Sequence, residues 1–369
     1  MTMRRRTFVG SLLAAAGAAA VWRGLPGPGR AARRSLSGGE PLADGRVLVR
    51  GAALAFGTTV SIAAVHADPG EALAAVREAL GRIRGIDALM TVFRPGSEVS
   101  RLNAEGVLDR PDPRLVRVLE FSQRLAALSG GAFDVTVQPL WSLFVASARA
   151  GRLPSRDEIA RARARVGFEA LEVSPRRVRL GRAGMAVTLN GVAQGYAADL
   201  AAEALRERGV RDALVDAGEH GAAGTRQPGE PWRIGVRHPR RPAALLGAVE
   251  MDGRFVAVSG DYATPFSEDL RHHHVFDPRT GLSPPDRSCA VVAAATGLEA
   301  DGLTKAVMVL DPPRARALLA RFPGAGAVLV GKDGRVAAEG LRLVPAELPT
   351  RASEPERRAR APRREGDRR

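Results

Sequence analysis

The chain has 369 residues, enough for one large domain or two, and its 45% hydrophobic content is typical of a soluble globular protein. Its net charge of +15 sits mostly at the two ends, where residues 1–34 carry seven arginines and no acidic residue and residues 351–369 carry eight arginines against four acidic residues. The mildly basic body and the low aromatic content of 4% argue against a nucleic-acid-binding surface.

The N-terminus has the pattern of an export signal. Arg5 and Arg6 precede an apolar, alanine-rich run, and Phe8 follows them at the spacing of a twin-arginine signal. The run is short for a stable membrane span, which favours export over a permanent anchor and allows a transient membrane association. We therefore expect an exported protein, in the periplasm or on the outer face of the cytoplasmic membrane. Residues 1–34 are assigned to this signal and the start of a linker, and 35–46 to the rest of the linker.

The first half of the body, which we expect to form one domain over 47–348, begins with two strands and a long helix. The strands lie within 47–66 and join at the turn-prone FGTT sequence. Asp68, Asp112 and Ser155 each have the sequence context of a helix N-cap. The helices that follow them are expected from 69 to about 89, from 113 to about 129, and from 156 onward. Short strands are predicted at 170–174, 177–181 and 185–189.

The stretch 189–224 is predicted to hold a ligand. It contains a glycine-rich turn, a helix with one apolar face, a stop at Gly209, a buried strand and a second glycine-rich turn. Gly191 and Gly195 leave room for a ligand to approach the backbone, and helix N-termini favour anions, so phosphate is the first expectation. An ordinary capped helix packed on a sheet is the alternative.

The C-terminal half continues with consecutive strands. Strands are expected near 232–237, 245–250, 254–258 and 288–295, then helices at 298–309 and 312–321 and a hairpin that turns at Lys332-Asp333-Gly334. Because the strands come in groups and the helices are not regularly interleaved, the fold class is α+β, with antiparallel sheets and packed helices. Cys289, the single cysteine, lies in an apolar run and is predicted to be a core residue. Residues 349–369 are arginine-rich and are predicted to be disordered.

Four further stretches are rich in polar or ionisable residues: 91–103, 130–140, 259–262 together with 272–281, and 300–307. Each has a structural interpretation when taken alone. SGDY and DPRTG are typical of β-turns, the three histidines at 272–274 fit a surface strand, and Asp301 fits a helix cap.

Taken in order, these stretches resemble the FAD:protein FMN transferase (ApbE) family. The resemblance covers about 56–330 and rests on several ordered motifs: Phe56-Gly57-Thr58, Phe93 with SEVSRLN, GAFDVTVQPL, GVAQGYAAD, SGDY, HVFDPRTG and ADGLTKAV. It implies a transferase that breaks the pyrophosphate of FAD, attaches FMN through a phosphoester to a Thr hydroxyl of an acceptor flavoprotein, and releases AMP. Hydrolysis of FAD to FMN and AMP in the same pocket, or FAD binding and delivery without catalysis, are the alternatives.

The resemblance also implies roles for individual residues. The positions that match FAD contacts are Phe56, Phe93, Ala132, Phe133, Asp134, Gln194, Leu200 and Phe276. The implied Mg²⁺ would be held by the Asp301 carboxylate and the Ala197 carbonyl, both hard oxygen ligands. A base that accepts the acceptor's proton near neutral pH is naturally histidine, and His274 is the candidate, while His272 and His273 are expected to face elsewhere.

Two departures from the family pattern concern charge. The family places a metal-ligating Thr four residues after the Asp, where this chain has Lys305, with Thr304 one residue earlier. Either Thr304 supplies the hydroxyl in a shifted register and Mg²⁺ is kept, which we expect, or Lys305 replaces part of the metal's charge at the pyrophosphate. The second departure is Gly218-Glu219-His220 in place of Gly-Gly-Asp. The resemblance therefore does not assign the residues that form the floor of the pocket.

Overall fold

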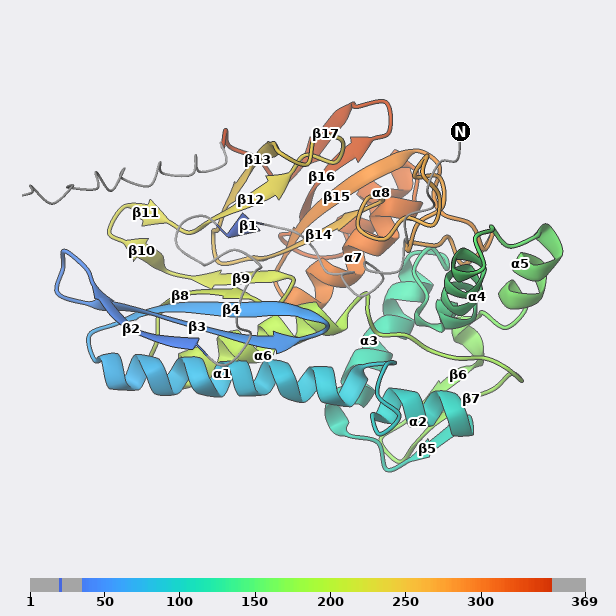
Figure 1. The fold of residues 1–369 in the computed structure, drawn as a ribbon, viewed down its shortest axis with the longest axis horizontal. Coiled ribbons are helices and arrows are strands. Elements are labelled where there is room, and N and C mark those ends of the chain that lie inside the picture. The colour runs from blue at the N-terminus through green and yellow to red at the C-terminus, as the bar shows by residue number, and fades with distance from the viewer. Residues whose placement is uncertain (1–19, 22–34, 347–369) are drawn as a thin grey trace, which may run out of the picture.

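The computed structural model describes residues 20–21 and 35–346 (Figure 1). The predicted export signal lies outside these ranges except for Ala20–Val21, and the predicted disordered tail lies wholly outside them. Within the described ranges, no helix combines the length and the apolar content that a bilayer crossing requires.

A nine-stranded sheet forms the centre of the molecule, and all its neighbouring strands are antiparallel. From one edge to the other its strands are β17 (Val336–Glu339), β16 (Gly326–Gly331), β15 (Arg287–Ala294), β14 (Phe255–Gly260), β9 (His220–Ala223), β8 (Asp212–Asp216), β4 (Thr58–His66), β3 (Val47–Ala55) and β2 (Ser35–Pro41). The predicted α+β class with antiparallel sheets is confirmed.

Helices cover one face of this sheet and a small sheet covers the other (Figure 1). The helices are α1 (Pro69–Met90), α6 (Ala193–Glu207) and α7 (Gly297–Val309). The small sheet consists of β1 (Ala20–Val21), β12 (Arg233–Arg237) and β13 (Leu245–Glu250). Successive side chains of β15 point to opposite faces of the central sheet. Ala290 and Val292 join the core under the helices, and Cys289 and Val291 join the core under the small sheet. Cys289 is thus the buried core residue predicted from its sequence.

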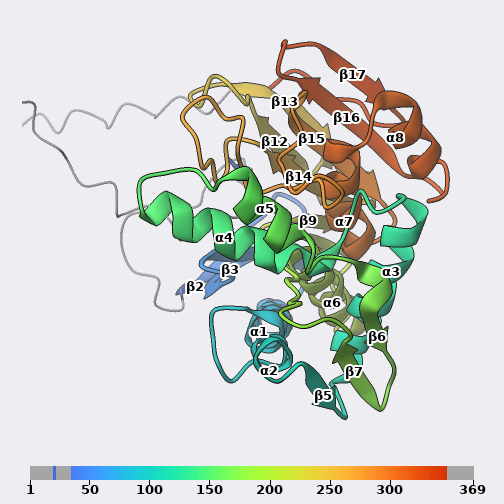
Figure 2. The same cartoon turned by 90° about the vertical axis from the view of Figure 1, so that its right-hand side faces the viewer.

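A group of shorter elements lies beyond one end of α1, and α4 and α5 cross the middle of the side view (Figure 2). These elements are α2 (Glu98–Glu105), β5 (Val107–Asp109), α3 (Pro113–Leu128), α4 (Gln138–Arg149), α5 (Arg156–Arg163), β6 (Leu171–Val173) and β7 (Arg177–Leu180), with 3₁₀ turns at Val135–Val137 and Phe168–Ala170. The remaining elements are β10 (Thr225–Gln227), β11 (Glu230–Pro231) and α8 (Pro312–Leu319).

Local capping explains where the predicted helices begin. The Asp68 carboxylate accepts hydrogen bonds from the backbone N–H groups of Gly70 and Glu71 at the start of α1, and Asp112 caps α3 in the same way. Ser155 and Glu158 form the predicted capping box of α5. These starts, and both strands of the FGTT hairpin, are confirmed.

Two expectations about local structure were wrong, and two helices were missed. Residues 185–189 do not form a strand, because Asn103 bonds both backbone polar groups of Val187 and the Val135 carbonyl accepts the Thr188 N–H, so no neighbouring strand is needed. The predicted linker over 35–46 contains β2, which pairs with β3. Helices α2 and α4 were not predicted, although Ser97 caps the first and Pro139 occupies the first turn of the second.

The central sheet is narrowest where β9 meets β14. Their pairing consists of the single residue pair Val256 and His220, whereas β14 and β15 pair over six residues. A side chain adds one connection, since the Val258 N–H donates a hydrogen bond of 3.0 Å to the Glu219 carboxylate. We call this junction the β9–β14 seam.

Candidate active site

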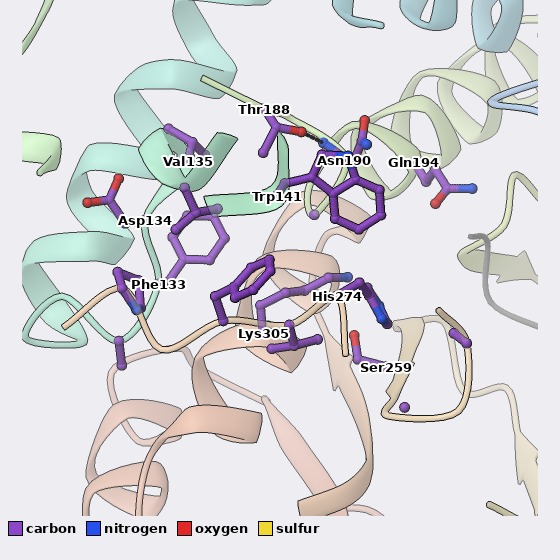
Figure 3. A pocket seen from close by; sticks show the side chains of 18 of the residues that line it. Phe133, Asp134, Val135, Trp141, Thr188, Asn190, Gln194, Ser259, His274 and Lys305 are labelled. Atoms are coloured by element: carbon purple, nitrogen blue, oxygen red, sulfur yellow. Dashed lines mark hydrogen bonds between the residues drawn. The ribbon is translucent and has the colours of Figure 1, made fainter. Parts of the chain in front are cut away.

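A cavity lies at the end of the β9–β14 seam and opens to solvent. Figure 3 shows side chains that line it. Five of the segments selected in the sequence line it, although they span residues 132 to 305 in the chain. The residues that they contribute lie within 132–137, 188–194, 258–263 and 274–278, together with Lys305, and Trp141 and Glu219 complete the wall. A concave site with a few convergent polar groups suits a small organic ligand.

One side of the cavity is aromatic. Phe133, Trp141 and Phe276 line it, and Phe276 is fixed from behind by the ring of Phe144, whose centroid lies 5.1 Å away. The nearby Phe133 N–H donates to the Ser129 hydroxyl at 3.1 Å, which fixes the turn that follows α3. Flat rings of this kind suit contact with the planar ring systems of a flavin or an adenine.

Asp134 lies beside this wall with both carboxylate oxygens engaged. One oxygen accepts the Thr136 N–H at 2.7 Å and the other accepts the Phe168 N–H at 2.9 Å. Burial raises the pKa of Asp134, and these hydrogen bonds work against that shift. Asp134 therefore lines the pocket as predicted, and the contacts seen here hold the shape of the loop.

The turn before α6 forms another side of the cavity. Thr188, Asn190, Gly191 and Gln194 all line it, and Figure 3 shows Thr188, Asn190 and Gln194 grouped together. Gln194 is held from below, because its side-chain amide donates to the Ala217 carbonyl at 3.2 Å. Gly191 lies against Lys305, since an added Cβ would lie 3.4 Å from Lys305 Cε.

The sequence suggested that Gly195 leaves room for a ligand, but in the structure it leaves room for a neighbouring helix. A Cβ at this position would lie 2.0 Å from the Gly297 carbonyl oxygen, so the missing side chain lets α6 and α7 come together. At this contact the Gly195 N–H donates to Asp301 Oδ2 at 3.0 Å. The close approach of the two helices therefore positions Asp301.

Asp301, Glu219 and Lys305 form a group at the floor of the cavity that we call the pocket trio. Lys305 Nζ hydrogen-bonds Asp301 Oδ1 one helical turn away in α7, and it lies 3.8 Å from Glu219 Oε1. The two carboxylate side chains are 0% and 4% exposed, whereas Lys305 is 18% exposed and lines the cavity. Both departures from the family pattern are therefore partners in one ion-pair network.

Burial and neighbouring charges shift the pKa values of Glu219 and Lys305. Burial raises the pKa of Glu219 well above its usual range, and the neighbouring Asp301 carboxylate adds to the rise. Burial by itself would lower the pKa of Lys305, but the attraction of Asp301 and Glu219 holds that pKa above its ordinary value. Lys305 is therefore a firmly protonated ammonium group facing the cavity.

His274 is the one member of the histidine triplet that lines the cavity, as predicted. Its backbone N–H donates to the Thr264 carbonyl at 3.1 Å, which anchors the segment. Burial, together with the Lys305 charge, lowers the pKa of His274 to about 4. The imidazole is therefore neutral near pH 7 and able to accept a proton.

The predicted Mg²⁺ ligands do not fit a metal ion. Both oxygens of Asp301 are taken, one by Lys305 and the other by the Gly195 N–H. The Thr304 hydroxyl accepts from Ser259 at 2.8 Å and donates to the Asp301 carbonyl at 2.7 Å. Within the described part of the chain, no group of three or more His, Cys, Asp or Glu side chains is arranged to hold a metal. An ammonium group next to Asp301 would also repel a divalent cation.

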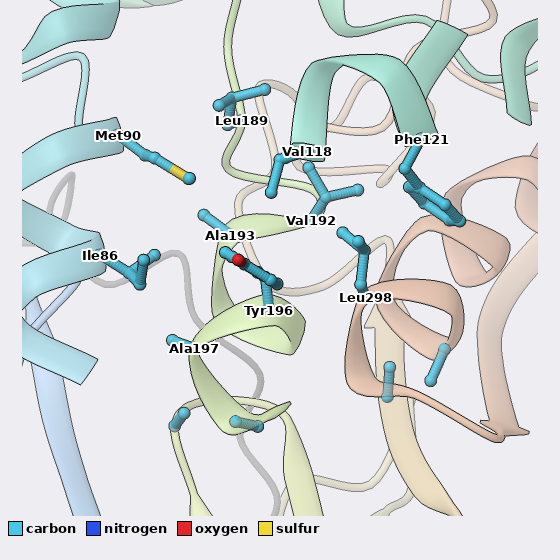
Figure 4. Packing of buried hydrophobic residues seen from close by; sticks show 14 of the residues in the cluster. Ile86, Met90, Val118, Phe121, Leu189, Val192, Ala193, Tyr196, Ala197 and Leu298 are labelled. Carbon is cyan, nitrogen blue, oxygen red and sulfur yellow. The ribbon is translucent and has the colours of Figure 1, made fainter. Parts of the chain in front are cut away.

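Ala197, the remaining predicted ligand, lies in the core under the sheet. It is 0% exposed in the second turn of α6, and Figure 4 shows its methyl group pointing toward α1. Within an α-helix, a carbonyl at this position is already bonded to the next turn. The structure thus places Ala197, which the resemblance implied as a carbonyl ligand, in the core and outside the residues that line the cavity.

Three of the predicted FAD contacts lie outside the cavity lining. Phe56 sits in the β3–β4 turn with a positive φ of 54° and packs on the core, and Leu200 packs on the same core from α6. Phe93 is 64% exposed, beyond the end of α1. Ala132, Phe133, Asp134, Gln194, Phe276 and Lys305 are the predicted FAD-binding residues that the fold brings together.

Several lining residues were not selected from the sequence. Trp141 was missed because α4 was missed, although tryptophan occurs only three times in the chain. Asn190 and Thr188 were missed because the segment before α6 looked like a strand. Ser259 was noted only as part of a turn, yet its hydroxyl links β14 to α7 through Thr304 and also faces the cavity.

Comparisons with known proteins show what this chain is similar to. The model of the ApbE family matches residues 56–329. The FAD:protein FMN transferase of Klebsiella pneumoniae (strain 342) is 31% identical over 294 residues, which cover 76% of this chain and 83% of that protein. Its counterpart from Escherichia coli (strain K12) is 30% identical and covers 67% of this chain and 74% of its own length.

Solved structures show the same likeness in three dimensions. The ApbE protein from Thermotoga maritima superimposes with a TM-score of 0.70 at 27% identity, covering 79% of this chain and 97% of that one. The flavin transferase ApbE from Vibrio cholerae gives a TM-score of 0.69 at 25% identity, with coverage of 80% and 97%. The fold predicted from the sequence is therefore the fold of these proteins.

Proposed function

The chain belongs to the ApbE family, and we propose that it is an FAD:protein FMN transferase that uses the cavity described above. FAD is its substrate and a flavoprotein is the acceptor of the FMN group. The observation that carries the proposal is the convergence of five separate motifs on one cavity with an aromatic wall, a neutral histidine and a lysine ammonium at its floor.

The reaction that fits this site is an in-line phosphoryl transfer. A hydroxyl oxygen of the acceptor, which we assign to a threonine, attacks the phosphorus on the FMN side of the pyrophosphate. A new O–P bond forms, the bond from that phosphorus to the bridging oxygen breaks, and AMP leaves with the bridging oxygen. His274 takes the proton of the attacking hydroxyl, because its imidazole lines the cavity in the neutral form.

The other groups of the cavity bind and position the substrate. Phe133, Trp141 and Phe276 offer flat surfaces for the ring systems, and Lys305 offers positive charge where the phosphates must lie. Because the predicted magnesium ligands are already bonded within the chain, no step of this proposal runs through a metal.

Location completes the proposal. The twin-arginine pattern at Arg5 and Arg6 supports export, so the acceptor would be met in the periplasm or on the outer face of the cytoplasmic membrane. Twin-arginine export carries folded proteins, which suits a site assembled from distant parts of the chain. A fusion of residues 1–46 to a reporter that fluoresces only after folded export tests this, and cytoplasmic retention of the reporter would contradict it.

The activity is tested by mixing the full-length chain with FAD and a flavin-acceptor domain, then viewing the denatured acceptor by in-gel flavin fluorescence. A fluorescent acceptor band with release of AMP is expected, and an acceptor whose target Thr is replaced by Ala should stay dark. FMN and AMP without an adduct would identify a hydrolase instead. Bound but unchanged FAD would identify a carrier, and no FAD binding would refute the whole proposal.

A further inference from the structure

The pocket trio places a fixed ammonium group where the sequence predicted a metal ion. Lys305 Nζ is bonded to the Asp301 carboxylate and lies 3.8 Å from Glu219. We propose that Lys305 supplies the positive charge at the FAD pyrophosphate in place of a divalent cation, so that this chain binds and cleaves FAD without Mg²⁺. The inference rests on the proposed function and adds a catalytic residue to it.

Several contacts fix the position of Lys305, which suits a group that must stabilise charge without moving. Its stem packs against Gly191, where an added Cβ would lie 3.4 Å from Lys305 Cε. Asp301 holds the ammonium from one turn away on the same helix and is itself held by the Gly195 N–H at 3.0 Å. A preorganised charge in a partly enclosed site contributes more to phosphoryl transfer than a mobile one in water.

The side chains of the pocket trio differ in how far they are exposed to the cavity. Asp301 is 0% exposed and does not line the cavity, whereas Lys305 lines it with 18% of its side chain exposed. A ligand in the cavity therefore meets the ammonium before it meets the buried carboxylate. Glu219 also lines the cavity, but only 4% of its side chain is exposed, and its carboxylate accepts the Val258 N–H at 3.0 Å.

The groups that would bind a metal ion at this position already have other partners. A divalent cation would have to displace Lys305 from Asp301 and would find the Thr304 hydroxyl already bonded to Ser259 and to the Asp301 carbonyl. The substitution that removes a hydroxyl ligand from the family pattern thus also installs the charge that replaces the ion. Glu219, the second departure, is the partner that stabilises this charge.

The test measures FAD binding by quenching of flavin fluorescence, with the full-length chain in EDTA and in millimolar Mg²⁺. For the wild-type chain we expect the two Kd values to agree within about twofold, because a preformed charge needs no ion. Lys305→Met should weaken binding by about 10- to 100-fold in both buffers, the range expected for losing a hydrogen bond to a charged group. Lys332→Met, which changes the only other lysine, is the matched control and should bind like wild type.

Two further variants separate charge from fold. Lys305→Arg keeps the cation and should retain binding in EDTA. It is used in place of Lys305→Met if the circular-dichroism spectrum of Lys305→Met differs from that of the wild-type chain. Lys305→Thr frees the Asp301 carboxylate and adds a hydroxyl beside it, so its binding should be weak in EDTA and recover at least tenfold with Mg²⁺.

Adduct formation measured in the same buffers should follow the binding data. A wild-type Kd that weakens more than tenfold in EDTA would overturn the inference and leave the proposed function standing. Wild-type affinity in folded Lys305→Met would overturn it as well. Failure of the wild-type chain to bind FAD in either buffer would refute the proposed function itself, and the inference with it.

Discussion

The chain contains two lysines, and each lies next to a buried aspartate, but the two surroundings have opposite character. In the pocket trio, Lys305 holds the Asp301 carboxylate and faces the cavity. In a second group, which we call the outer clamp, Lys332 lies 3.9 Å from Asp261 while Arg240 bonds both Asp261 oxygens at 2.8 and 2.7 Å. Lys332 Nζ donates to the Leu270 carbonyl, outside the cavity lining.

The contrast between the pocket trio and the outer clamp shows that a buried acid with a basic partner is not in itself a functional signal. Asp261, in the middle of the SGDY motif, is satisfied by a bidentate arginine and ties the 238–241 loop to β14, so its role is architectural. Asp301 is equally buried but its cation faces an open cavity. The two groups therefore differ in whether the cation lines the cavity and not in how deeply the aspartate is buried.

The largest effect should come from His274, which stands on the cavity side of this comparison. His274→Ala should slow adduct formation by about 10²- to 10⁴-fold, the usual contribution of a general base, while the Kd for FAD stays near the wild-type value. His272→Ala, outside the cavity lining, is the control. A loss of transfer that merely tracks a loss of FAD binding would remove His274 from the proton-transfer role.

The low pKa of His274 adds a pH dependence to this prediction. With a pKa of about 4, its imidazole is already neutral at pH 6 and gains a proton only as the pH falls toward 4. The wild-type rate should therefore show no acid limb from this group between about pH 6 and 8. A rate that halves near pH 6.5, the ordinary histidine pKa, would contradict the assigned burial.

Replacing the two buried aspartates compares the groups directly. Asp301→Ala should lower the free energy of unfolding by about 3–5 kcal/mol, because it leaves Lys305 mostly buried beside Glu219 and leaves the Gly195 N–H unpaired. Asp261→Ala should cost about 1–3 kcal/mol, since Arg240 is 36% exposed and can regain water. Urea denaturation measures both, and equal costs would show that the two groups have the same electrostatic environment.

The Asp301 value also corrects an expectation from the sequence. As an exposed helix cap, Asp301 would have contributed about 1 kcal/mol to stability. In the structure Thr296 and Glu299 form the capping box of α7, and Asp301 lies in the second turn, fully buried. Loss of activity in Asp301→Ala must therefore be interpreted beside its stability.

A smaller effect should follow from Gly195→Ala, which disturbs the support of the pocket trio and spares the outer clamp. The new methyl group would meet the Gly297 carbonyl at 2.0 Å, so α6 and α7 must separate, at a cost of about 1–3 kcal/mol. Thermal unfolding measures this cost. Gly191→Ala meets nothing closer than 3.4 Å and should unfold near the wild-type temperature, and a similar loss in both variants would contradict the helix-contact explanation.

The smallest effect is expected for Lys332→Met. Arg240 satisfies Asp261 by itself, so the loss of a lysine 3.9 Å away should cost less than about 1 kcal/mol and leave adduct formation unchanged. Parallel denaturation and transfer assays check both statements. A transfer defect in this variant would mean that the outer clamp affects the cavity, and that Lys332 is not purely structural.

Much of the fold follows from local sequence signals. Capping residues such as Asp68 and Ser155 and the apolar faces of the helices determine where helices begin and which side they bury. The predicted strand at 185–189 failed because the pairing partners of its backbone lie far away, in Asn103 and Val135. No pattern within a short window reports a partner more than 50 residues distant.

The candidate site was predicted in the same uneven way. Ordered motifs identified Asp134, Gln194, His274 and Lys305 among its polar residues. What they did not reveal is that Glu219 and Lys305, two separate departures from the family pattern, are 3.8 Å apart and compensate each other. Ala197 and Phe93 were misplaced because membership of a motif does not specify which way a side chain or carbonyl faces.

The β9–β14 seam has a consequence for how the molecule moves. A single residue pair joins the two halves of the sheet there, Glu219 stands on the β9 side, and α7 carries Lys305 on the β14 side. Separation of the halves would pull Lys305 from Glu219, and a ligand bound across both would hold them together. Backbone amides of β9 and β14 should then exchange with deuterium more slowly when FAD is bound, while those of β3 and β4, paired over nine residues, should change little.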